Sequence, residues 1–517
     1  MVIVSITPEI ALEKSVNYAG GLGVLAGDKF YAAGDMGLDY LVLSLFYRHG
    51  YVKIDFLPTG EPRLTHEEAS RDFFRQLHPE GEFTVKLRNM EVHVIPWSYE
   101  YRTAKAVLFE AMCPEWARKL NERVYIEDSE EEKFYKYALL AKAAATYLRE
   151  FVGLEKIYVL DLEESYTSLV LYELKELIPK ARIVIHTPGP WGHPTFPGYL
   201  IKQEFGIDVS EYVNMTEETL GKLSRAIVVS KKQKDIISRI FPKYEHKIIS
   251  ITNGVYLDRW MHPRLRKALT EKKLSTNLLK EVRSEAKEAL SSLIRQYKHI
   301  DLKDKLVVTW ARRLARYKRP YFVMKFVEEY PDLTEVVYVI SGKPHPKDPD
   351  GLNYLNMLRI LSQKYKNVVY IPDYNLEVAR LLLQGSDIWL FTPFSGWEAC
   401  GTSYMKALIN GVPVVSSKDG GVLEVVRDGY NGWLFGDDIR ELINIYNDPR
   451  AKQVDAKDYE EFKEKVLSAI DCYFNKPDEY WEMALNAAKE TPLIVDIKHA
   501  LRSYYGNPAL VSSSKNN

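Results

Sequence analysis

The side chains best suited to chemistry in this 517-residue chain lie between Glu398 and Lys406. They follow an apolar run at 387–392 and precede a second apolar run, so the pattern predicts a strand, a short turn and a helix. Open α/β sheets bind their ligands at such turns, beyond the carboxyl ends of parallel strands. The backbone N–H groups of Gly401 and Thr402 would face an anion at the start of that helix, with Lys406 one helical turn further on. The alternative for Lys406 is a solvated surface position, the usual place of a lysine.

A run of positive charge follows another predicted strand, at residues 307–310. It places five cations within eight residues: Arg312, Arg313, Arg316, Lys318 and Arg319. Two like charges ~4 Å apart repel by about 4 kcal/mol at an effective dielectric constant of about 20, and bound phosphate groups would relieve this repulsion. Because the run leaves the carboxyl end of its strand, we interpret it as a phosphate site. The alternative is a solvated charged surface.

Two further turns combine small residues with groups that could contact a ligand. Gly20 and Gly21 precede a helix predicted at residues 29–36, and glycines in this place let backbone N–H groups approach a phosphate. His186 ends a predicted strand and begins a loop rich in proline and glycine, where its ring could contact a ligand hydroxyl. Asn253 lies in a turn after a later strand. The alternatives are close packing for the glycines and a structural role for His186.

Composition excludes several classes of function. Hydrophobic residues make up 46% and charged residues 27% of the chain, as in ordinary soluble proteins, and the formal net charge of −1 points to neither nucleic acid nor a membrane surface as partner. The three cysteines are far apart, so we expect no disulfide framework and no metal site. The first residues do not form a signal peptide, and no apolar stretch approaches the ~18 residues of a membrane span. We therefore expect a cytoplasmic protein.

Strands and helices alternate along most of the chain, which predicts an α/β fold with doubly wound sheets. We divide the chain into a first domain at 1–300, which ends in an amphipathic linker helix, and a second domain at 301–477. Residues 478–517 are expected to form a helix that crosses back to the first domain, followed by a disordered end. The strands expected in the second domain are residues 307–310, 336–341, 368–371, 388–392 and 414–415.

Several of these segments resemble one family. Residues 398–406 read E-A-C-G-T-S-Y-M-K and are similar to the E-A-S-G-T-x-x-M-K motif of the α-glucan (glycogen and maltodextrin) phosphorylases. Matches run from residue 1 to about 436 and resemble a short form of archaeal and bacterial type. Further motifs match, among them S-x-x-x-x-G-G-L-G-x-L-A-G-D at 15–28, H-T-P-x-P-x-G-H-x-x-F at 186–196, I-T-N-G-V at 251–255, A-[KR]-R-x-x-x-Y-K-R-P at 311–320 and D-Y-x-x-x-x-A-R-x-L at 373–382.

The resemblance implies a fold and a cofactor. The fold is the GT-B arrangement, in which two Rossmann-like domains face each other across the active site; here residues 1–300 would bind glucan and phosphate, and 301–477 would bind the cofactor. The cofactor is pyridoxal 5′-phosphate (PLP), carried by Lys406 as a Schiff base. The resemblance implies that the other residues at the cofactor are Gly401, Thr402, Arg312, Lys318 and Tyr374.

The resemblance also implies the reaction: phosphorolysis of α-1,4-glucans from the non-reducing end, which gives α-D-glucose 1-phosphate with retention. Inorganic phosphate would protonate the glycosidic oxygen, with the PLP phosphate as its proton partner. The catalytic residues would be Arg313, Lys318, His186 and Lys406. The substrate-binding residues would be Gly20, Gly21, His186, Asn253, Glu398 and Gly401. The partners are therefore glucan and inorganic phosphate, with no nucleic acid or membrane, and a homodimer is one option for assembly.

The chain departs from the family pattern at four places. Cys400 replaces a serine, Tyr404 replaces glycine or asparagine, and residues 163–166 read E-E-S-Y in place of N-D-x-H. Residues 419–426 look more like those of a nucleotide-sugar transferase. One alternative is therefore a glycogen-synthase-like glucosyltransferase. Lys406 disfavours it, because many nucleotide-sugar transferases have glutamate at this position. The other alternative is a non-catalytic glucan-binding relative, which the presence of Arg313, Lys318 and Lys406 disfavours.

Overall fold

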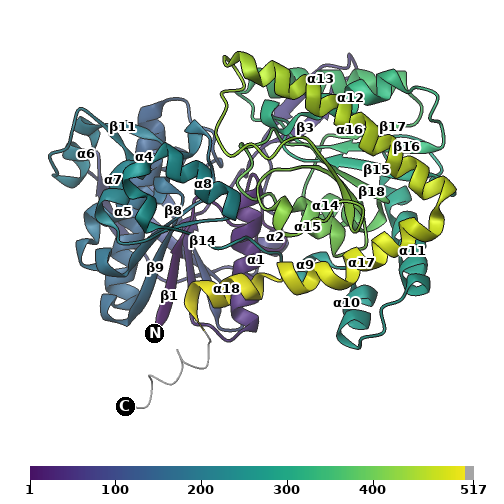
Figure 1. The fold of residues 1–517 in the computed structure, drawn as a ribbon. Helices are drawn as coiled ribbons and strands as arrows, with labels where there is room; N and C mark the ends of the chain where they lie inside the picture. The colour runs from purple at the N-terminus through teal and green to yellow at the C-terminus, as the bar shows by residue number, and fades with distance from the viewer. Residues whose placement is uncertain (507–517) are drawn as a thin grey trace. The chain divides into compact units, whose positions relative to one another are not determined.

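The computed structural model describes residues 1–506, so the expected disordered end lies outside the described residues. The chain forms two compact units, and segments of each unit are separated in the sequence (Figure 1). Of the described residues, the first unit contains Met1–Tyr51, His66–Asn253 and 497–506; the second contains Val52–Thr65 and Gly254–Asp496.

The first unit is built on a ten-stranded sheet in the order β14-β13-β10-β9-β1-β2-β8-β7-β5, with β6 also paired to β7. The strands from β14 to β8 are parallel, whereas β7 runs antiparallel to β8, β5 and β6. The order of the parallel strands reverses between β1 and β9, where Val4 pairs with Leu41 on one side and with Leu160 on the other. The strands are β1 (Val2–Ile6), β2 (Tyr40–Leu45), β5 (His78–Pro79), β6 (Phe83–Leu87), β7 (Met90–Tyr101), β8 (Ala104–Cys113), β9 (Ile157–Glu163), β10 (Ala181–Ile185), β13 (Ala226–Val228) and β14 (Ile248–Ser250).

Helices flank this sheet. The first unit also contains a separate two-stranded ribbon of β11 (Thr195–Pro197) and β12 (Tyr212–Asn214). The buried helix α4 shows why such a helix begins where it does. The hydroxyl of Ser129 accepts a hydrogen bond from the N–H of Glu132 at 3.1 Å. Three glutamates in the first turn stabilise the helix by their interaction with its dipole. The helices are α1 (Gly21–Asp35), α2 (Arg71–Phe74), α3 (Glu115–Leu120), α4 (Glu130–Tyr147), α5 (Val170–Glu173), α6 (Gly198–Phe205), α7 (Met215–Lys222), α8 (Lys231–Ile240) and α18 (Ile497–Tyr505).

The second unit contains a parallel six-stranded sheet in the order β17-β16-β15-β18-β19-β20. The strand order reverses between β15 and β18, which is where doubly wound sheets bind ligands. All five strands expected in this part of the chain are present, and β20 was missed. The strands are β15 (Leu306–Ala311), β16 (Val336–Ser341), β17 (Val368–Ile371), β18 (Ile388–Phe391), β19 (Val414–Ser417) and β20 (Gly432–Phe435), with a separate hairpin of β3 (Lys53–Phe56) and β4 (Pro62–Thr65).

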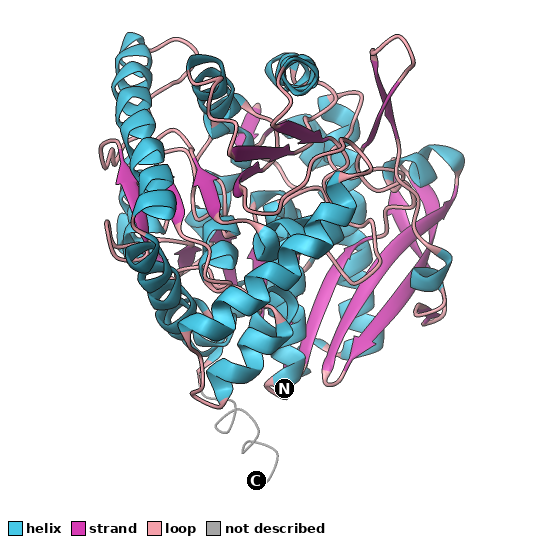
Figure 2. Cartoon of the chain, turned by 90° about the vertical axis from the view of Figure 1, so that its right-hand side faces the viewer, coloured by secondary structure: helices cyan, strands magenta, loops and turns pink. Residues whose placement is uncertain are grey.

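Helices also flank the second sheet (Figure 2). They are α9 (Leu257–Trp260), α10 (Pro263–Thr270), α11 (Thr276–Ile294), α12 (Pro320–Glu329), α13 (Pro349–Lys364), α14 (Leu376–Gly385), α15 (Ser403–Leu408), α16 (Pro449–Asn475) and α17 (Pro477–Val495). Among residues 1–506, no helix combines the length and the apolar character needed to cross a membrane.

The bounds of the compact units differ from the domain bounds expected from the sequence. Helix α11, expected as a linker within residues 1–300, belongs to the second unit. Its buried Arg283 donates to the carboxylate of Asp387 at 3.2 Å and to the carbonyl groups of Asn410 and Gly411 at 3.1 and 3.0 Å. These bonds join α11 to the second sheet, in agreement with its place in the segment Gly254–Asp496 of this unit.

We expect the variant Arg283→Ala to lower the free energy of unfolding by about 3–5 kcal/mol, because it leaves buried acceptors without their donor. The control is Arg264→Ala, which removes an exposed pair of bonds from α10 to Glu281 and Glu285 and should cost less than about 1 kcal/mol. Urea denaturation of both variants measures the difference. Equal midpoints would contradict the role given to Arg283.

Candidate active site

A buried cluster of charge lies where the strand order of the second sheet reverses. Arg312 follows β15, and its Nη2 donates to Glu398 Oε2 at 2.5 Å. The ammonium group of Lys318 donates to the same oxygen. Burial raises the pKa of Glu398, but the charges of Lys318 and Arg312 outweigh that effect and lower it to about 2. Glu398 is therefore an ionised carboxylate across the physiological pH range.

The cation run is partly buried, so the solvated-surface alternative is wrong for Arg312, Lys318 and Arg319. Glu398 relieves the repulsion between Arg312 and Lys318, whereas Arg319 is paired with Asp455 and Asp458. The spacing of the run did not indicate these anions. Arg319 has a different role: it is fully buried and donates to the carbonyl groups of Thr392 and Pro393 at 2.8 and 2.9 Å. It thereby ties this loop to the end of β18. Arg313, in contrast, is exposed.

The turn that carries Glu398 is held by Asp419. The carboxylate of Asp419 accepts from the N–H groups of Gly396 and Glu398, each at 2.7 Å. The next residue, Gly420, has φ +58°, and a Cβ there would lie 2.9 Å from the carbonyl oxygen of Glu398. This explains part of the 419–426 departure: these residues position Glu398.

Lys406 lies in helix α15 and is buried, so the surface alternative is wrong. Its Nζ lies 4.0 Å from the ring centroid of Trp260, at the end of α9, a favourable place for a cation. The side chain of Asn410 donates to the carbonyl groups of Trp260 and Lys406, both at 2.9 Å. Sequence reasoning did not link Trp260 or Asn410 to the site, because the contact joins distant segments.

The polar groups around Lys406 suit a phosphate-bearing cofactor. Arg312 Nη1 is buried and has no hydrogen-bond partner among the described residues, so it has a donor left for a phosphate oxygen. A Cβ on Gly401 would lie 2.8 Å from the Phe391 ring and 3.0 Å from Arg312 Nη2, so only glycine fits. Burial raises the pKa of Tyr374 to about 12, although the nearby charge of Arg312 lowers this pKa. Thr402 precedes α15, and its hydroxyl does not cap the helix. This donor set fits a phosphate group.

In the first unit, α1 begins at Gly21, eight residues before the predicted start. Gly20 is its N-cap, and added Cβ atoms at Gly20 and Gly21 meet nothing within 4 Å, so close packing does not explain these glycines. The carboxylate of Glu9 accepts from the N–H groups of Ala19 and Gly20 at 2.5 and 3.2 Å. An acidic side chain therefore already binds the amide of Gly20, and phosphate binding by the two glycines stays a prediction.

His186 belongs to a buried ion cluster. Its Nε2 lies 2.5 Å from Glu163 Oε2, and Lys29 Nζ donates to Glu163 Oε1 at 2.7 Å. Burial alone would raise the pKa of Glu163, but Lys29 and His186 outweigh that effect and lower the pKa to about 2. Burial also lowers the pKa of His186, so we assign a neutral ring whose Nε2–H donates to Glu163 and whose Nδ1 is the acceptor. Asn253 is buried, and its N–H donates to the Val229 carbonyl at 3.1 Å.

The neighbouring Glu164 is a candidate that sequence reasoning missed. Burial raises its pKa to about 8, so the carboxyl is mostly protonated at neutral pH. Its Oε1 accepts from the Thr187 hydroxyl at 2.6 Å, whereas Oε2 has no partner among the described residues. Its φ of +69° is unusual for a residue other than glycine. Strain and a perturbed pKa together often mark functional positions.

Comparisons with known proteins find similarity to phosphorylases. A family model described as carbohydrate phosphorylase matches residues 263–492, which include Glu398 and Lys406. The chain is 26% identical to a glycogen phosphorylase of Aquifex aeolicus, over 84% of this chain and 76% of that protein. This chain is related to the carbohydrate phosphorylases.

Two further relatives match over a similar share of this chain. The chain is 24% identical to a maltodextrin phosphorylase of Thermococcus litoralis, over 86% of this chain and 65% of that protein. It is 27% identical to an uncharacterized protein of Methanocaldococcus jannaschii, over 82% of this chain and 86% of that protein. The resemblance of the motifs to phosphorylases is thereby confirmed. The individual residue roles stay predictions.

The low pKa of Glu398 predicts how stability depends on pH. The folded-state pKa of about 2 lies below the ordinary 4.5, so the carboxylate stabilises the fold above pH 4.5, and this contribution is lost as the pH falls toward 2. Its size is about 3 kcal/mol. Acid denaturation should therefore show a stability difference between wild type and Glu398→Gln that shrinks between pH 4.5 and 2.

The matched control is Glu285→Gln, because Glu285 is exposed and pairs with Arg264 on the surface. Its unfolding curve should follow that of the wild type over the whole range. If the Glu398 variant follows the wild type as well, the ion cluster does not have the proposed energy.

Proposed function

We propose that this protein is a glycosyltransferase of the α-glucan phosphorylase type, which cleaves the terminal α-1,4 bond at the non-reducing end of a glucan with inorganic phosphate. The product is α-D-glucose 1-phosphate, formed with retention. One observation carries the proposal: buried Lys406 lies in the segment that matches the family, in the same turn region as an ionised carboxylate held by two cations. The relatives reported above give no support to the nucleotide-sugar alternative.

The cofactor we propose is PLP, bound to Lys406. Arg312 would donate its unpaired N–H to the cofactor phosphate, with Lys318, Tyr374, Gly401 and Thr402 around it. When bound, PLP would supply a phosphate group able to exchange a proton with inorganic phosphate. The Trp260 ring would hold Lys406 in place and exclude water from it.

The other side chains would bind and orient the substrates. Arg313 is exposed and would bind inorganic phosphate, and its charge would stabilise the negative charge of the transition state. Glu398, which stays ionised, would accept hydrogen bonds from the 3- and 4-hydroxyl groups of the glucosyl residue. We assign the 6-hydroxyl to His186 Nδ1 and Asn253. These contacts fix the sugar without forming a covalent bond to the protein.

The strand orders favour the GT-B fold for the two units. Each parallel set begins with a central strand, adds strands on one side, and then continues on the other side of the first strand. This is the order of doubly wound nucleotide-binding sheets. We propose that the first unit binds glucan and phosphate and that the second binds PLP. The cytoplasmic location and the homodimer stay predictions.

The proposed activity is tested by incubating the protein, supplied with PLP, with maltoheptaose and inorganic phosphate. We expect α-D-glucose 1-phosphate, and the reverse reaction should release phosphate from it without any nucleotide. The variant Arg313→Ala should lose about 10²–10³-fold in kcat/KM, the usual cost of one transition-state donor. The control Arg316→Ala, in the same run but 3.9 Å from Asp350, should stay near wild type. Glucose transfer only from UDP-glucose or ADP-glucose would overturn the proposal.

The cofactor site is tested without an activity assay. The protein is incubated with PLP, its absorption spectrum is recorded, and the complex is reduced with borohydride and digested for peptide mass analysis. We expect the added mass on Lys406, and its loss in Lys406→Arg. The variant Lys267→Ala, at a side chain that is 76% exposed, should retain the label on Lys406. Label confined to other lysines would contradict the assignment.

A further inference from the structure

Two histidines and one glutamate of the first unit lie close enough to share a metal ion. His49, His66 and Glu68 each offer one ligand atom, and these atoms all lie within 4.8 Å of one another. His66 Nε2 lies 3.6 Å from Glu68 Oε1, and the ring centroids of His49 and His66 are 4.4 Å apart. Among residues 1–506, no other group of three such side chains is brought together in this way. We call these three residues the histidine cluster.

Backbone hydrogen bonds hold the two segments that carry the histidine cluster. The N–H of His49 donates to the Glu122 carbonyl at 2.9 Å, and the carbonyl of His49 accepts from the N–H of Glu67 at 3.1 Å. The next residue, Gly50, has φ +54°, and a Cβ there would lie 2.8 Å from Glu67 Oε2, so this turn requires glycine. The two histidines are therefore brought together by contacts that do not use their rings.

The side chains of the cluster are available to a ligand. The side chains of His66 and Glu68 are 48% and 78% exposed, so an ion can reach them from solvent. His49 is half-buried, and its Nδ1 is enclosed without a hydrogen-bond partner among the described residues. An enclosed polar atom without a partner is unfavourable, so the His49 ring gains when it binds a ligand.

The types of the three side chains select the ion. Two imidazoles and one carboxylate suit a divalent transition ion such as Zn²⁺, whereas Mg²⁺ and Ca²⁺ prefer oxygen ligands. Ligand atoms ~2.1 Å from a tetrahedral ion lie about 3.4 Å apart, close to the 3.6 Å between His66 Nε2 and Glu68 Oε1. Small rotations of these two exposed side chains would complete the geometry, with water in the fourth position.

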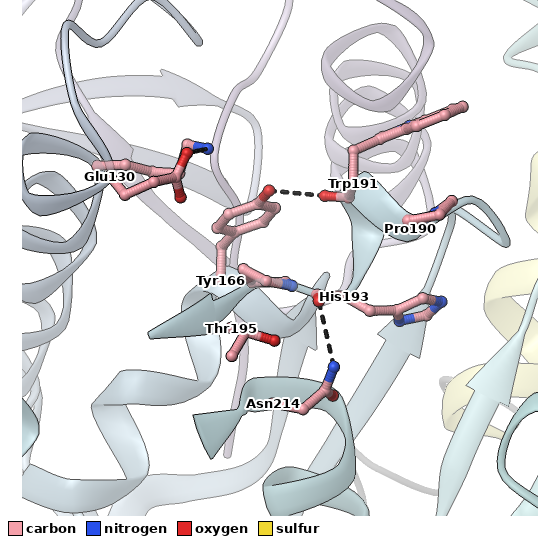
Figure 3. Close-up of a pocket in the computed structure, with 9 residues that line it drawn as sticks. Glu130, Tyr166, Pro190, Trp191, His193, Thr195 and Asn214 are labelled. Carbon is pink, nitrogen blue, oxygen red and sulfur yellow. Dashed lines mark hydrogen bonds and ion pairs between the residues drawn. The ribbon is translucent and has the colours of Figure 1, made fainter. Parts of the chain in front are cut away.

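The histidine cluster is separate from the hollow of about 480 Å³ on the same unit, because none of its side chains lines that hollow (Figure 3). The lining of the hollow includes the turns after β9 and β10, where the Tyr166 hydroxyl donates to the Trp191 carbonyl at 2.6 Å. The cluster lies on the chain between β2 and α2. It contains none of the residues assigned above to substrate or cofactor.

We propose that the histidine cluster binds one divalent transition ion of the zinc type through His49, His66 and Glu68. The expectation of no metal site rested on the cysteines, and these histidines are too far apart in the sequence to form a local motif. Between them lies Val52–Thr65, which belongs to the second unit, so a bound ion would hold the two points at which the chain leaves the first unit and returns to it. The site does not depend on the function proposed above.

The proposal is tested by titrating Zn²⁺ into the full-length protein after EDTA treatment and dialysis, with calorimetry as the readout. We expect one site per chain, and Co²⁺ in place of Zn²⁺ should give the visible absorption of a four-coordinate ion. His66→Ala should lower the Zn²⁺ affinity at least about 100-fold, because a lost ligand costs more than a lost outer partner. Glu68→Gln should lower it at least about tenfold, since an amide is a weaker ligand than a carboxylate.

The matched control is His78→Ala, at an exposed histidine of β5 in the same unit that lies outside the cluster. Its Zn²⁺ affinity should equal that of the wild type. Because His66 and Glu68 are exposed, all variants should fold, with the same Tm as the wild type in EDTA. Zn²⁺ at about 100 times its Kd should raise the Tm by about 3–5 °C in the wild type and the His78 variant, but not in the His66 variant.

The outcomes decide the proposal without an activity assay. Loss of Zn²⁺ binding and of the Co²⁺ absorption in the His66 and Glu68 variants, but not in the His78 variant, supports the histidine cluster. Equal Zn²⁺ affinity in all of these proteins would place the ion elsewhere and overturn the proposal. A wild-type protein without saturable Zn²⁺ binding overturns it as well, and neither result affects the proposed phosphorolysis.

Discussion

The site of the second unit depends on one carboxylate, Glu398, shared by two cations. Buried charges are stable only when they are paired, so Arg312 and Lys318 can occupy the end of the sheet because Glu398 is there. The partners come from segments that follow β15 and β18. These two strands are neighbours because the strand order of the six-stranded sheet reverses at this point. The ion cluster and the topology therefore require each other. A wrong strand order would bury these charges without partners.

The first unit uses the same arrangement with different residues. Glu163 ends β9 and lies between Lys29, in the helix that follows β1, and His186, which follows β10. Here too the carboxylate lies at the reversal of strand order, and its pKa is lowered to about 2. Each unit thus stabilises the ligand side of its sheet with a buried anion between two basic groups. The cluster in the first unit leaves one imidazole nitrogen as acceptor, a group suited to a hydroxyl donor.

Sequence patterns predicted what depends on neighbouring residues. The strands β16 and β17 have the predicted bounds because they are short, continuous apolar runs. The start of α1 was predicted too late, since four glycines lie between residues 20 and 27 and lower helix propensity, a cost that burial of the helix offsets. The amphipathic pattern of α11 showed that one face is buried, but it could not show which unit buries it. The positions of Trp260, Asn410 and Arg319 depend on contacts between distant segments, which no local pattern contains.

The charge around Glu398 and Arg312 would act on both proposed ligands. The side chains there are ionised and buried, which strengthens the interaction of Arg312 with a phosphate. Glu398 stays ionised, so a sugar hydroxyl that replaces water there would donate a charge-assisted hydrogen bond to it. In the proposed reaction, the cations would act on the phosphate, while the carboxylate would hold the sugar.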